Sequence, residues 1–421
     1  MKSNNKIYPW IVVILLWGVA FLNYMDRQML STMRESMMID ISELESAANF
    51  GRLMAIFLWI YGIMSPISGI IGDRFSRKWL IIGSLFVWSF VTLLMGFCTD
   101  FTEIYILRGI MGISEALYIP AGLSIIADYH TDKTRSLAVG LHMTGLYSGQ
   151  AIGGFGAVVA NLFSWQTTFH VFGFIGIAYS LILVLFLHDK TDRDDKTDRD
   201  DKIENLRHKE TKSPLNGMKL LLGSFTFWII LLYFAVPSLP GWATKNWLPT
   251  LFSSNLSIDM TTAGPISTIT IAISSFLGVL IGGFLSDKWV QRNIRGRIYV
   301  SSIGTAITIP ALFLLGLGNS LLATLAGAIC YGVGFGMFDA NNMPILCQFV
   351  SSKYRATAYG LMNTVGVFSG AFITTWLGKS TDSGHLGTDF ALMSIIVIIV
   401  LAVELYFLHP RKDKLIGFVK E

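Results

Sequence analysis

Four charged side chains lie inside long apolar stretches of the sequence, where a charge is costly. Asp26 and Arg27 are neighbours in the segment LNYMDRQML. Arg108 and Glu115 lie in RGIMGISEALYIP, two helical turns apart and therefore on one face of a helix. Each such charge costs on the order of 2.5–3.5 kcal/mol at the centre of a membrane helix. The chemistry open to them is anion binding by guanidinium and proton transfer by carboxylate, and together they predict a shared aqueous cavity in which the charges pair.

Pairing of these groups would link the two kinds of chemistry. An anion that occupies Arg27 or Arg108 removes the partner of the carboxylate beside it, which then holds a proton more tightly. Asp26 lies next to Arg27, and Glu115 shares a face with Arg108, so both carboxylates are candidate proton carriers. Glu115 is favoured, because we expect it to lie deeper and further from the cations. In another interpretation Asp26 and Arg27 mark the membrane interface and Arg108 reaches toward it, which leaves Glu115 unexplained.

The elements that must position these residues are membrane-spanning helices. Of the 421 residues 52% are hydrophobic and 14% are charged, a composition typical of a polytopic membrane protein. Apolar segments of spanning length predict an all-α membrane protein with twelve transmembrane helices. The predicted spans are 7–27, 53–72, 79–98, 103–126, 136–160, 168–187, 221–250, 264–286, 298–316, 321–349, 356–378 and 389–408.

The distribution of Lys and Arg predicts the orientation of the chain. If successive loops alternate between the two sides, most of these residues fall on one side, and only Arg34, Arg52 and Lys379 lie in loops on the other. Positive charge is enriched in cytoplasmic loops, so we expect the N- and C-termini in the cytoplasm. The formal net charge of +4 then reflects topology and predicts no nucleic-acid partner.

The chain is built from two similar halves. A polar segment, 188–220, contains the tandem hexapeptide KTDRDDKTDRDD and is typical of a solvated linker. It separates an N-terminal six-helix bundle at 1–187 from a C-terminal one at 221–421. GIIGDRFSRK in the first half is repeated as GFLSDKWVQR in the second, and KTRSLAVGL as KYRATAYGL. Duplicated halves of this kind, related by a pseudo-two-fold axis, are expected to hold a ligand between them near mid-membrane.

The first repeated motif carries a resemblance to a known family. GIIGDRFSRK resembles the signature between helices 2 and 3 of the major facilitator superfamily, and its weaker copy follows helix 8, where that family also places one. The resemblance covers the whole chain and implies a secondary transporter. A cytoplasmic Asp in this loop can accept from the exposed N–H groups of a helix end, in a charge network that breaks when the halves rock. The expected gating residues are Gly69, Asp73, Arg74, Arg77, Lys78, Asp287, Lys288 and Arg292.

A narrower resemblance concerns the charged segments. NYMDR in helix 1 with RGIMGISEA in helix 4 resembles the anion:cation symporter family of sugar-acid permeases and vesicular sialic acid and glutamate carriers; NWLPTLF and GVLIGGFLSD also match. This resemblance implies that Tyr24 and Arg27 contact an organic anion and that Arg108 holds the charge network. Asp26 and Glu115 would then carry protons. Helix 5 lacks a clear match to that family's substrate-contacting polar residue, and helix 10 carries the unusual segment FDANNMP.

Other polar residues within the spans could complete the cavity. Hydroxyls and amides bond sugar hydroxyls, although any single one more often forms an interhelical hydrogen bond. Lys245 stands out because a second cation facing Arg27 would suit an anion, although it could equally lie at the outer mouth. Glu404, near the end of the last helix, is expected at the membrane interface. The substrate-binding candidates are Tyr24, Arg27, Arg108, Tyr61, Tyr147, Gln150, Lys245, Asn341, Asn342 and Asn363.

These observations predict a proton-coupled symporter that imports an organic anion by alternating access. The expected substrate is a sugar acid such as a hexuronate, an aldonate or a sialate, and the expected location is a bacterial inner membrane, with lipid around a multi-pass monomer. The alternatives are a spinster-like lipid or lysolipid transporter, a facilitator of neutral sugars, and a receptor that binds without moving solute. No nucleophile–base or metal-binding constellation is present, so we expect neither an enzyme nor a metal site, and no cofactor other than protons as the coupling ion.

Overall fold

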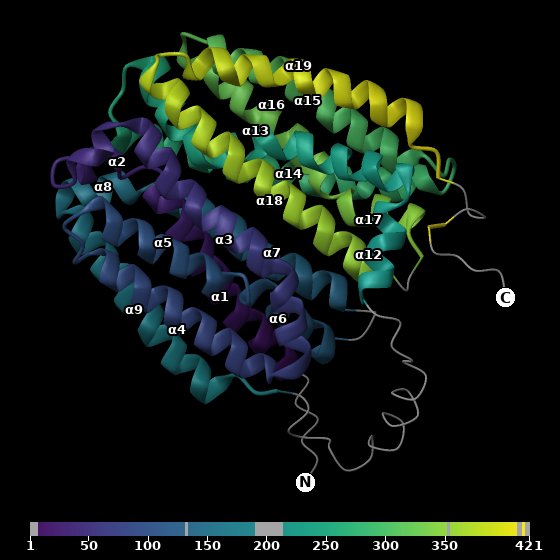
Figure 1. Ribbon diagram of the computed structural model, residues 1–421, viewed down its shortest axis with the longest axis horizontal. Helices are drawn as coiled ribbons and strands as arrows, with labels where there is room; N and C mark the ends of the chain where they lie inside the picture. The colour runs from purple at the N-terminus through teal and green to yellow at the C-terminus, as the bar shows by residue number, and fades with distance from the viewer. Residues whose placement is uncertain (1–6, 131–133, 190–213, 352–353, 411–414, 417–421) are drawn as a thin grey trace.

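The computed structural model describes residues 7–130, 134–189, 214–351, 354–410 and 415–416, with side chains described except at 69–70, 72–74, 136 and 214–216. This part of the chain consists of helices and loops, apart from one isolated bridge between Val350 and Ile416. Figure 1 shows two groups of helices lying side by side, the first in purple to teal and the second in green to yellow.

Each group is made of consecutive helices. The first contains α1 (Tyr8–Leu30), α2 (Arg34–Met37), the short η1 (Ser42–Glu45), α3 (Ala47–Arg74), α4 (Arg77–Met95), α5 (Phe101–Glu115), α6 (Tyr118–Tyr129), α7 (Arg135–Gly153), α8 (Gly156–Leu162) and α9 (Trp165–Phe186). The second contains α12 (Pro214–Leu222), α13 (Phe225–Leu256), α14 (Met260–Val290), α15 (Gly296–Leu317), α16 (Leu321–Asp339), α17 (Asn342–Phe349), α18 (Arg355–Asp382) and α19 (Leu386–Phe407).

Most of the predicted spans are long apolar helices. Within the described residues, 10 helices are long and apolar enough to cross a membrane, and two of these are interrupted by short breaks, between α5 and α6 and between α16 and α17. The other two predicted spans, 136–160 and 356–378, are helical in α7–α8 and in α18 but carry more polar residues. The structure thus gives an all-helical membrane protein, while the count of twelve spans and the cytoplasmic location of the termini stay predictions.

The two groups meet along two pairs of helices. α3 packs against α18, and α7 packs against α14. The second long helix of one group therefore contacts the fifth of the other in both cases, which is the reciprocal contact that a two-fold relation requires.

The predicted linker lies largely outside the described residues. Where the chain is described again it forms α12, which extends into the segment predicted to be polar linker. α13 begins at Phe225, after a break at Ser224, and not at the predicted residue 221. It also runs six residues beyond the predicted end at 250, to Leu256, and Leu251 and Phe252 in this last part are buried.

Glycines on α7 determine how closely α1 approaches. Gly149 and Gly153 lie one turn apart and share a face. A Cβ atom at Gly149 would lie 2.2 Å from the carbonyl oxygen of Phe21, and one at Gly153 would lie 2.8 Å from that of Met25. Small residues at this spacing let membrane helices pack backbone to backbone, and this contact positions the charged end of α1.

The two groups are joined on the side of the molecule opposite to the start of α1. There the Asp382 carboxylate, at the end of α18, accepts hydrogen bonds from the backbone N–H groups of Ala47 at 2.6 Å and Ala48 at 3.0 Å. The last residue of α18 thus caps the N-terminus of α3, where a negative charge is favoured. Further along the same two helices, the amide of Asn363 donates to the Ser65 hydroxyl at 3.2 Å.

The side chain of Glu404, expected at the membrane interface, is packed between helices and is not exposed. The residue is fully buried, and the hydroxyl of Ser302 on α15 donates to its carboxylate. α19 packs against α15, and the rotation of α19 about its axis turns Glu404 into that contact. Position along a helix therefore did not determine exposure here.

Candidate substrate-binding and proton-coupling site

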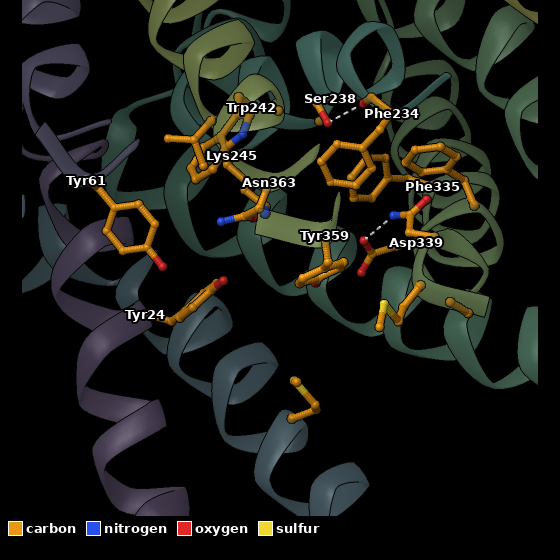
Figure 2. A pocket seen from close by; sticks show the side chains of 18 of the residues that line it. Tyr24, Tyr61, Phe234, Ser238, Trp242, Lys245, Phe335, Asp339, Tyr359 and Asn363 are labelled. Atoms are coloured by element: carbon orange, nitrogen blue, oxygen red, sulfur yellow. Dashed lines mark hydrogen bonds between the residues drawn. The ribbon is translucent and has the colours of Figure 1, made fainter. Parts of the chain in front are cut away.

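A cavity lies between the two groups of helices. It consists of two adjoining parts of about 330 and 580 Å³, and Tyr24, Tyr61, Lys245 and Asp339 line both. These volumes fall within the range of roughly 300–1,000 Å³ that is typical of pockets for small organic ligands. In Figure 2, Tyr24 and Tyr61 from the first group face Lys245 and Asp339 from the second across this space. The larger part extends to Val279 on α14.

Arg27 lies in the cavity wall and is paired with a buried carboxylate. Its Nε donates to Oε2 of Glu115 at 2.6 Å. The guanidinium also lies over the rings of Tyr24, Phe57 and Tyr61, at 5.2, 4.7 and 4.9 Å from their centroids, where aromatic faces attract a cation. Its Nη2 has no hydrogen-bond partner among the residues that the structure describes. An unsatisfied cationic donor beside a cavity is chemically suited to donate to an anion.

Glu115 is the last residue of α5, at the break before α6. Its side chain is fully buried, and the amide of Asn23 donates to the same Oε2 at 2.9 Å. The other oxygen, Oε1, has no hydrogen-bond partner in the described structure. The expectation that Glu115 lies further from the cations is therefore wrong, because the side chain of Arg27 reaches from α1 to the end of α5.

Arg108 is buried beneath the cavity and does not line it. Its guanidinium lies 4.9 Å from the centroid of Phe57, the ring that also contacts Arg27. Nη1 lies 3.0 Å from the sulfur of Met111. Direct contact of Arg108 with a substrate is thus not supported by this arrangement, whereas a place in the charge network stays a prediction.

Asp26 also points away from the cavity. It is buried at 6% exposure, and the hydroxyl of Thr92 on α4 donates to its Oδ2 at 3.3 Å. Neighbours on a helix point about 100° apart, since there are 3.6 residues per turn. Asp26 and Arg27 therefore face different helices, and they form no ion pair within the described part of the chain.

The remaining predicted binding residues also differ in whether they reach the cavity. Asn341 is fully buried, and its amide donates to the carbonyl oxygen of Met337 at 2.8 Å within its own turn, so it does not reach the cavity. Its neighbour Asn342 does. The predicted residues that line the cavity are Tyr24, Arg27, Tyr61, Tyr147, Gln150, Lys245, Asn342 and Asn363.

Two residues that the predicted binding set omitted are prominent in the cavity wall. Asp339, the last residue of α16, exposes its side chain to the cavity, and Tyr359 on α18 lines both parts. Both are labelled in Figure 2. The signal for Asp339 was present in the sequence, since it is a charge inside a predicted span. A single tyrosine such as Tyr359 carries no comparable signal.

The described gating residues make contacts within their own group of helices. Arg77 at the start of α4 is paired with Asp128 at the end of α6. Asp287 near the end of α14 accepts a hydrogen bond from Arg297 of α15 at 3.1 Å. These pairs join neighbouring helices on the side where α1 begins.

The structure shows less about the other expected gating residues. Lys78 donates through Nζ to the carbonyl oxygen of Val184 at 3.1 Å, while Lys288 and Arg292 are exposed. The side chains of Asp73 and Arg74 lie outside the described part of the structure, and Gly69 has none, so the gating role of all three stays a prediction.

Two reciprocal groups of membrane helices around a central cavity with buried charges define a membrane transport protein and not an enzyme. The chain belongs to the Major Facilitator Superfamily, whose sequence profile matches residues 16–375.

Individual relatives narrow the comparison. The chain is 23% identical to the "Probable L-galactonate transporter" of Escherichia coli (strain K12), over 98% of this chain and 93% of that protein. It is 23% identical to the "Probable galactarate/D-glucarate transporter GarP" of the same organism, over 87% of this chain and 86% of that protein. A solved structure of a bacterial homolog of the human lysosomal transporter Spinster, inward-facing and occupied, has the same fold, with a TM-score of 0.77 and 19% identity over 96% of this chain and 97% of that one.

Proposed function

We propose that the protein is a proton-coupled symporter that takes up a sugar acid by alternating access. The observation that carries the proposal is the Arg27–Glu115 pair at the cavity wall. A carboxylate substrate and the Glu115 carboxylate would compete for the same guanidinium. Two relatives with names that specify sugar acids support the substrate class.

The pair supplies a mechanism for coupling. When the substrate carboxylate binds the guanidinium of Arg27, Glu115 loses its cationic partner while it remains buried, and its neutral form becomes favoured. A proton and the anion then enter the occluded state together. Release of the anion restores the Arg27–Glu115 contact and expels the proton. Reciprocity requires that protons tighten anion binding by the same factor as the anion tightens proton binding.

The walls of the cavity suit a polyhydroxylated anion. Lys245 supplies a second cation, with its ammonium 4.7 Å from the ring centroid of Trp242. Gln150, Asn363 and Tyr147 add amides and a hydroxyl, which can exchange hydrogen bonds with sugar hydroxyls.

The contacts between the halves support alternating access. α3 and α18 are joined by Asp382 and by the Asn363–Ser65 bond, and the cavity extends from there toward the side where α1 begins. With the termini in the cytoplasm, as the charge distribution predicts, the cavity extends inward. A bacterial inner membrane is the location that we propose.

Uptake into proteoliposomes tests the proposal. Labelled galactonate should accumulate above its external concentration when the lumen is alkaline, and a protonophore should abolish the accumulation. Uptake that only equilibrates, or that is indifferent to the pH gradient, would remove proton coupling. Absence of galactonate, glucuronate and sialate uptake would remove the sugar-acid assignment.

The cavity also supports a second candidate, a lipid or lysolipid transporter. Part of its wall is apolar, formed by Ile119, Leu123, Leu146, Ile271 and Val279, and the Spinster homolog shares the fold. Stabilisation of the purified protein by lysolipid monomers and not by sugar acids would favour this candidate.

A further inference from the structure

The duplicated halves carry a second pair of charged residues that corresponds to Arg27 and Glu115. EALYIP, which begins at Glu115, aligns with DANNMP, which begins at Asp339. The helix ends at the carboxylate in both halves, and the next helix begins three residues later, at Tyr118 and at Asn342. Asp339 is therefore the counterpart of Glu115 by sequence and by its place at a helix break.

The cationic partner is duplicated as well. YMDRQ in α1 aligns with WATKN in α13, so that Lys245 corresponds to Arg27 and Trp242 to Tyr24. The aromatic contact is also repeated: Arg27 lies 5.2 Å from the ring centroid of Tyr24, and Lys245 lies 4.7 Å from that of Trp242.

The two pairs differ in geometry. Arg27 and Glu115 are closed on each other at 2.6 Å, with Glu115 fully buried. Lys245 and Asp339 form no ion pair with each other within the described residues, and both line the cavity. Figure 2 shows them separated, with Asp339 on the far side from Tyr61. The second pair is thus open to a ligand.

Asp339 is held in place by a chain of hydrogen bonds. The amide of Asn342 donates to its Oδ1 at 3.1 Å. The oxygen of the same amide accepts from the Tyr233 hydroxyl at 3.2 Å, and Tyr233 is bonded to Ser301 at 2.7 Å. These contacts orient the carboxylate, while its side chain remains exposed to the cavity. A fixed, accessible carboxylate accepts hydrogen bonds from hydroxyls and repels another carboxylate.

We propose that Asp339 is a specificity-determining residue that selects sugar acids with one carboxylate over those with two. Lys245 joins Arg27 in binding the carboxylate of the substrate, and Asp339 accepts hydrogen bonds from the hydroxyls at its other end. A second carboxylate at that end meets Asp339 and is rejected. This inference rests on the proposed function and specifies its substrate class as aldonates and hexuronates, with aldarates disfavoured.

Galactonate and galactarate make a matched pair of probes, because they differ only in a hydroxymethyl group or a carboxylate at carbon 6. Binding of each to the purified full-length protein at pH 7 is measured by calorimetry. We expect galactonate to bind at least about tenfold more tightly than galactarate, since a second carboxylate placed close to Asp339 is repelled by its like charge. In Asp339→Asn the ratio should fall by at least about fivefold, mainly because galactarate binds more tightly.

Control variants separate this role from a structural one. Asp339→Glu keeps the charge and should keep the preference. Lys245→Gln should weaken both ligands and leave their ratio within about twofold, because both carry the carboxylate that Lys245 binds. Asp389→Asn removes a charge at the start of α19, where Asp389 accepts from Trp376 outside the cavity, and should leave both affinities unchanged. Thermal unfolding confirms that each variant is folded.

The outcomes are distinct. A galactonate/galactarate ratio that Asp339→Asn leaves unchanged would overturn the role of Asp339 while the sugar-acid function stands. A wild-type protein that binds the two acids equally would also overturn the role of Asp339 and leave the sugar-acid function standing. If the wild type binds neither acid and binds a lysolipid, the proposed function fails, and this inference fails with it.

Discussion

Nε of Arg27 on α1 lies 2.6 Å from Oε2 of Glu115 on α5. This contact joins a residue of the cavity wall to a carboxylate that has no exposure of its own. In the proposed mechanism, Glu115 responds to the contents of the cavity through Arg27. The contact also distinguishes the two candidate proton carriers. Glu115 is paired with Arg27, whereas Asp26 is bonded to Thr92 and forms no ion pair with Arg27 in the described structure.

Glu115→Gln should abolish uphill uptake that is driven by a pH gradient. Glutamine imitates the protonated carboxyl permanently, so the substrate can bind but no proton is released. Counterflow of labelled against unlabelled galactonate should persist, since exchange needs no net proton movement. Asp26→Asn is the companion variant and should have the smaller effect on coupling, because Asp26 forms no ion pair among the described residues. If both variants still accumulate substrate with an alkaline lumen, these carboxylates are not the coupling groups.

Arg27→Lys should weaken binding of the sugar acid by about tenfold or more, because an ammonium offers neither the planar fork nor the ring stacking of guanidinium. Calorimetry on the purified protein measures the change. Arg52→Lys is the matched control: Arg52 lies exposed on α3 and donates to Asn49, and its replacement should leave affinity unchanged. Near-normal affinity in Arg27→Lys would place the substrate carboxylate elsewhere.

Asp382→Asn should loosen the contact between the halves on the side opposite to the start of α1. A carboxylate at a helix N-terminus contributes about 0.3–1 kcal/mol. Its loss should change the ratio of molecules with this contact closed to molecules with it open by about two- to fivefold. Spin labels at Glu43 and Ser383, both exposed, would report the distribution of distances between the two labels by double electron–electron resonance.

Asp100→Asn is the control for this experiment. Asp100 accepts from the N–H of Glu103 at 3.0 Å and so caps α5 within one group of helices. Its replacement removes a cap of the same kind without touching the contact between the halves. We expect the distance distribution to shift in Asp382→Asn alone, and equal shifts in both variants would refute a gating role.

Gly149→Ala should destabilise the protein, because the added Cβ would lie 2.2 Å from the carbonyl oxygen of Phe21. Overpacking of this kind costs about 1–3 kcal/mol. Thermal unfolding in detergent measures the loss. Gly140→Ala on the same helix is the control, since a Cβ there would have nothing within 4 Å. A change in Gly140→Ala as large as in Gly149→Ala would mean that the α1–α7 contact is not the cause.

Much of the fold follows from local sequence properties. Runs of apolar residues at spanning length identified the long helices, because a membrane helix must satisfy its backbone internally and cover itself with apolar side chains. The duplicated motifs identified two halves. Charges inside the apolar runs identified Arg27, Glu115 and Lys245 as unusual, since their desolvation requires a compensating environment.

The sequence did not reveal which charged residues contact each other. Spacing along one helix placed Glu115 on the same face as Arg108, but the position of α1 relative to the end of α5 determines that Glu115 contacts Arg27. Rotation about the helix axis likewise separates neighbours that look equivalent in sequence: Asn342 reaches the cavity and Asn341 does not.

The sequence by itself determined which residues are costly to bury and that the chain is built twice. The tertiary structure alone decided which of the two duplicated charge pairs is closed and which is open. The physical reason is that an ion pair depends on the distance between atoms on different helices, and that distance is set by helix crossing and rotation. Periodicity within one helix carries no information about either.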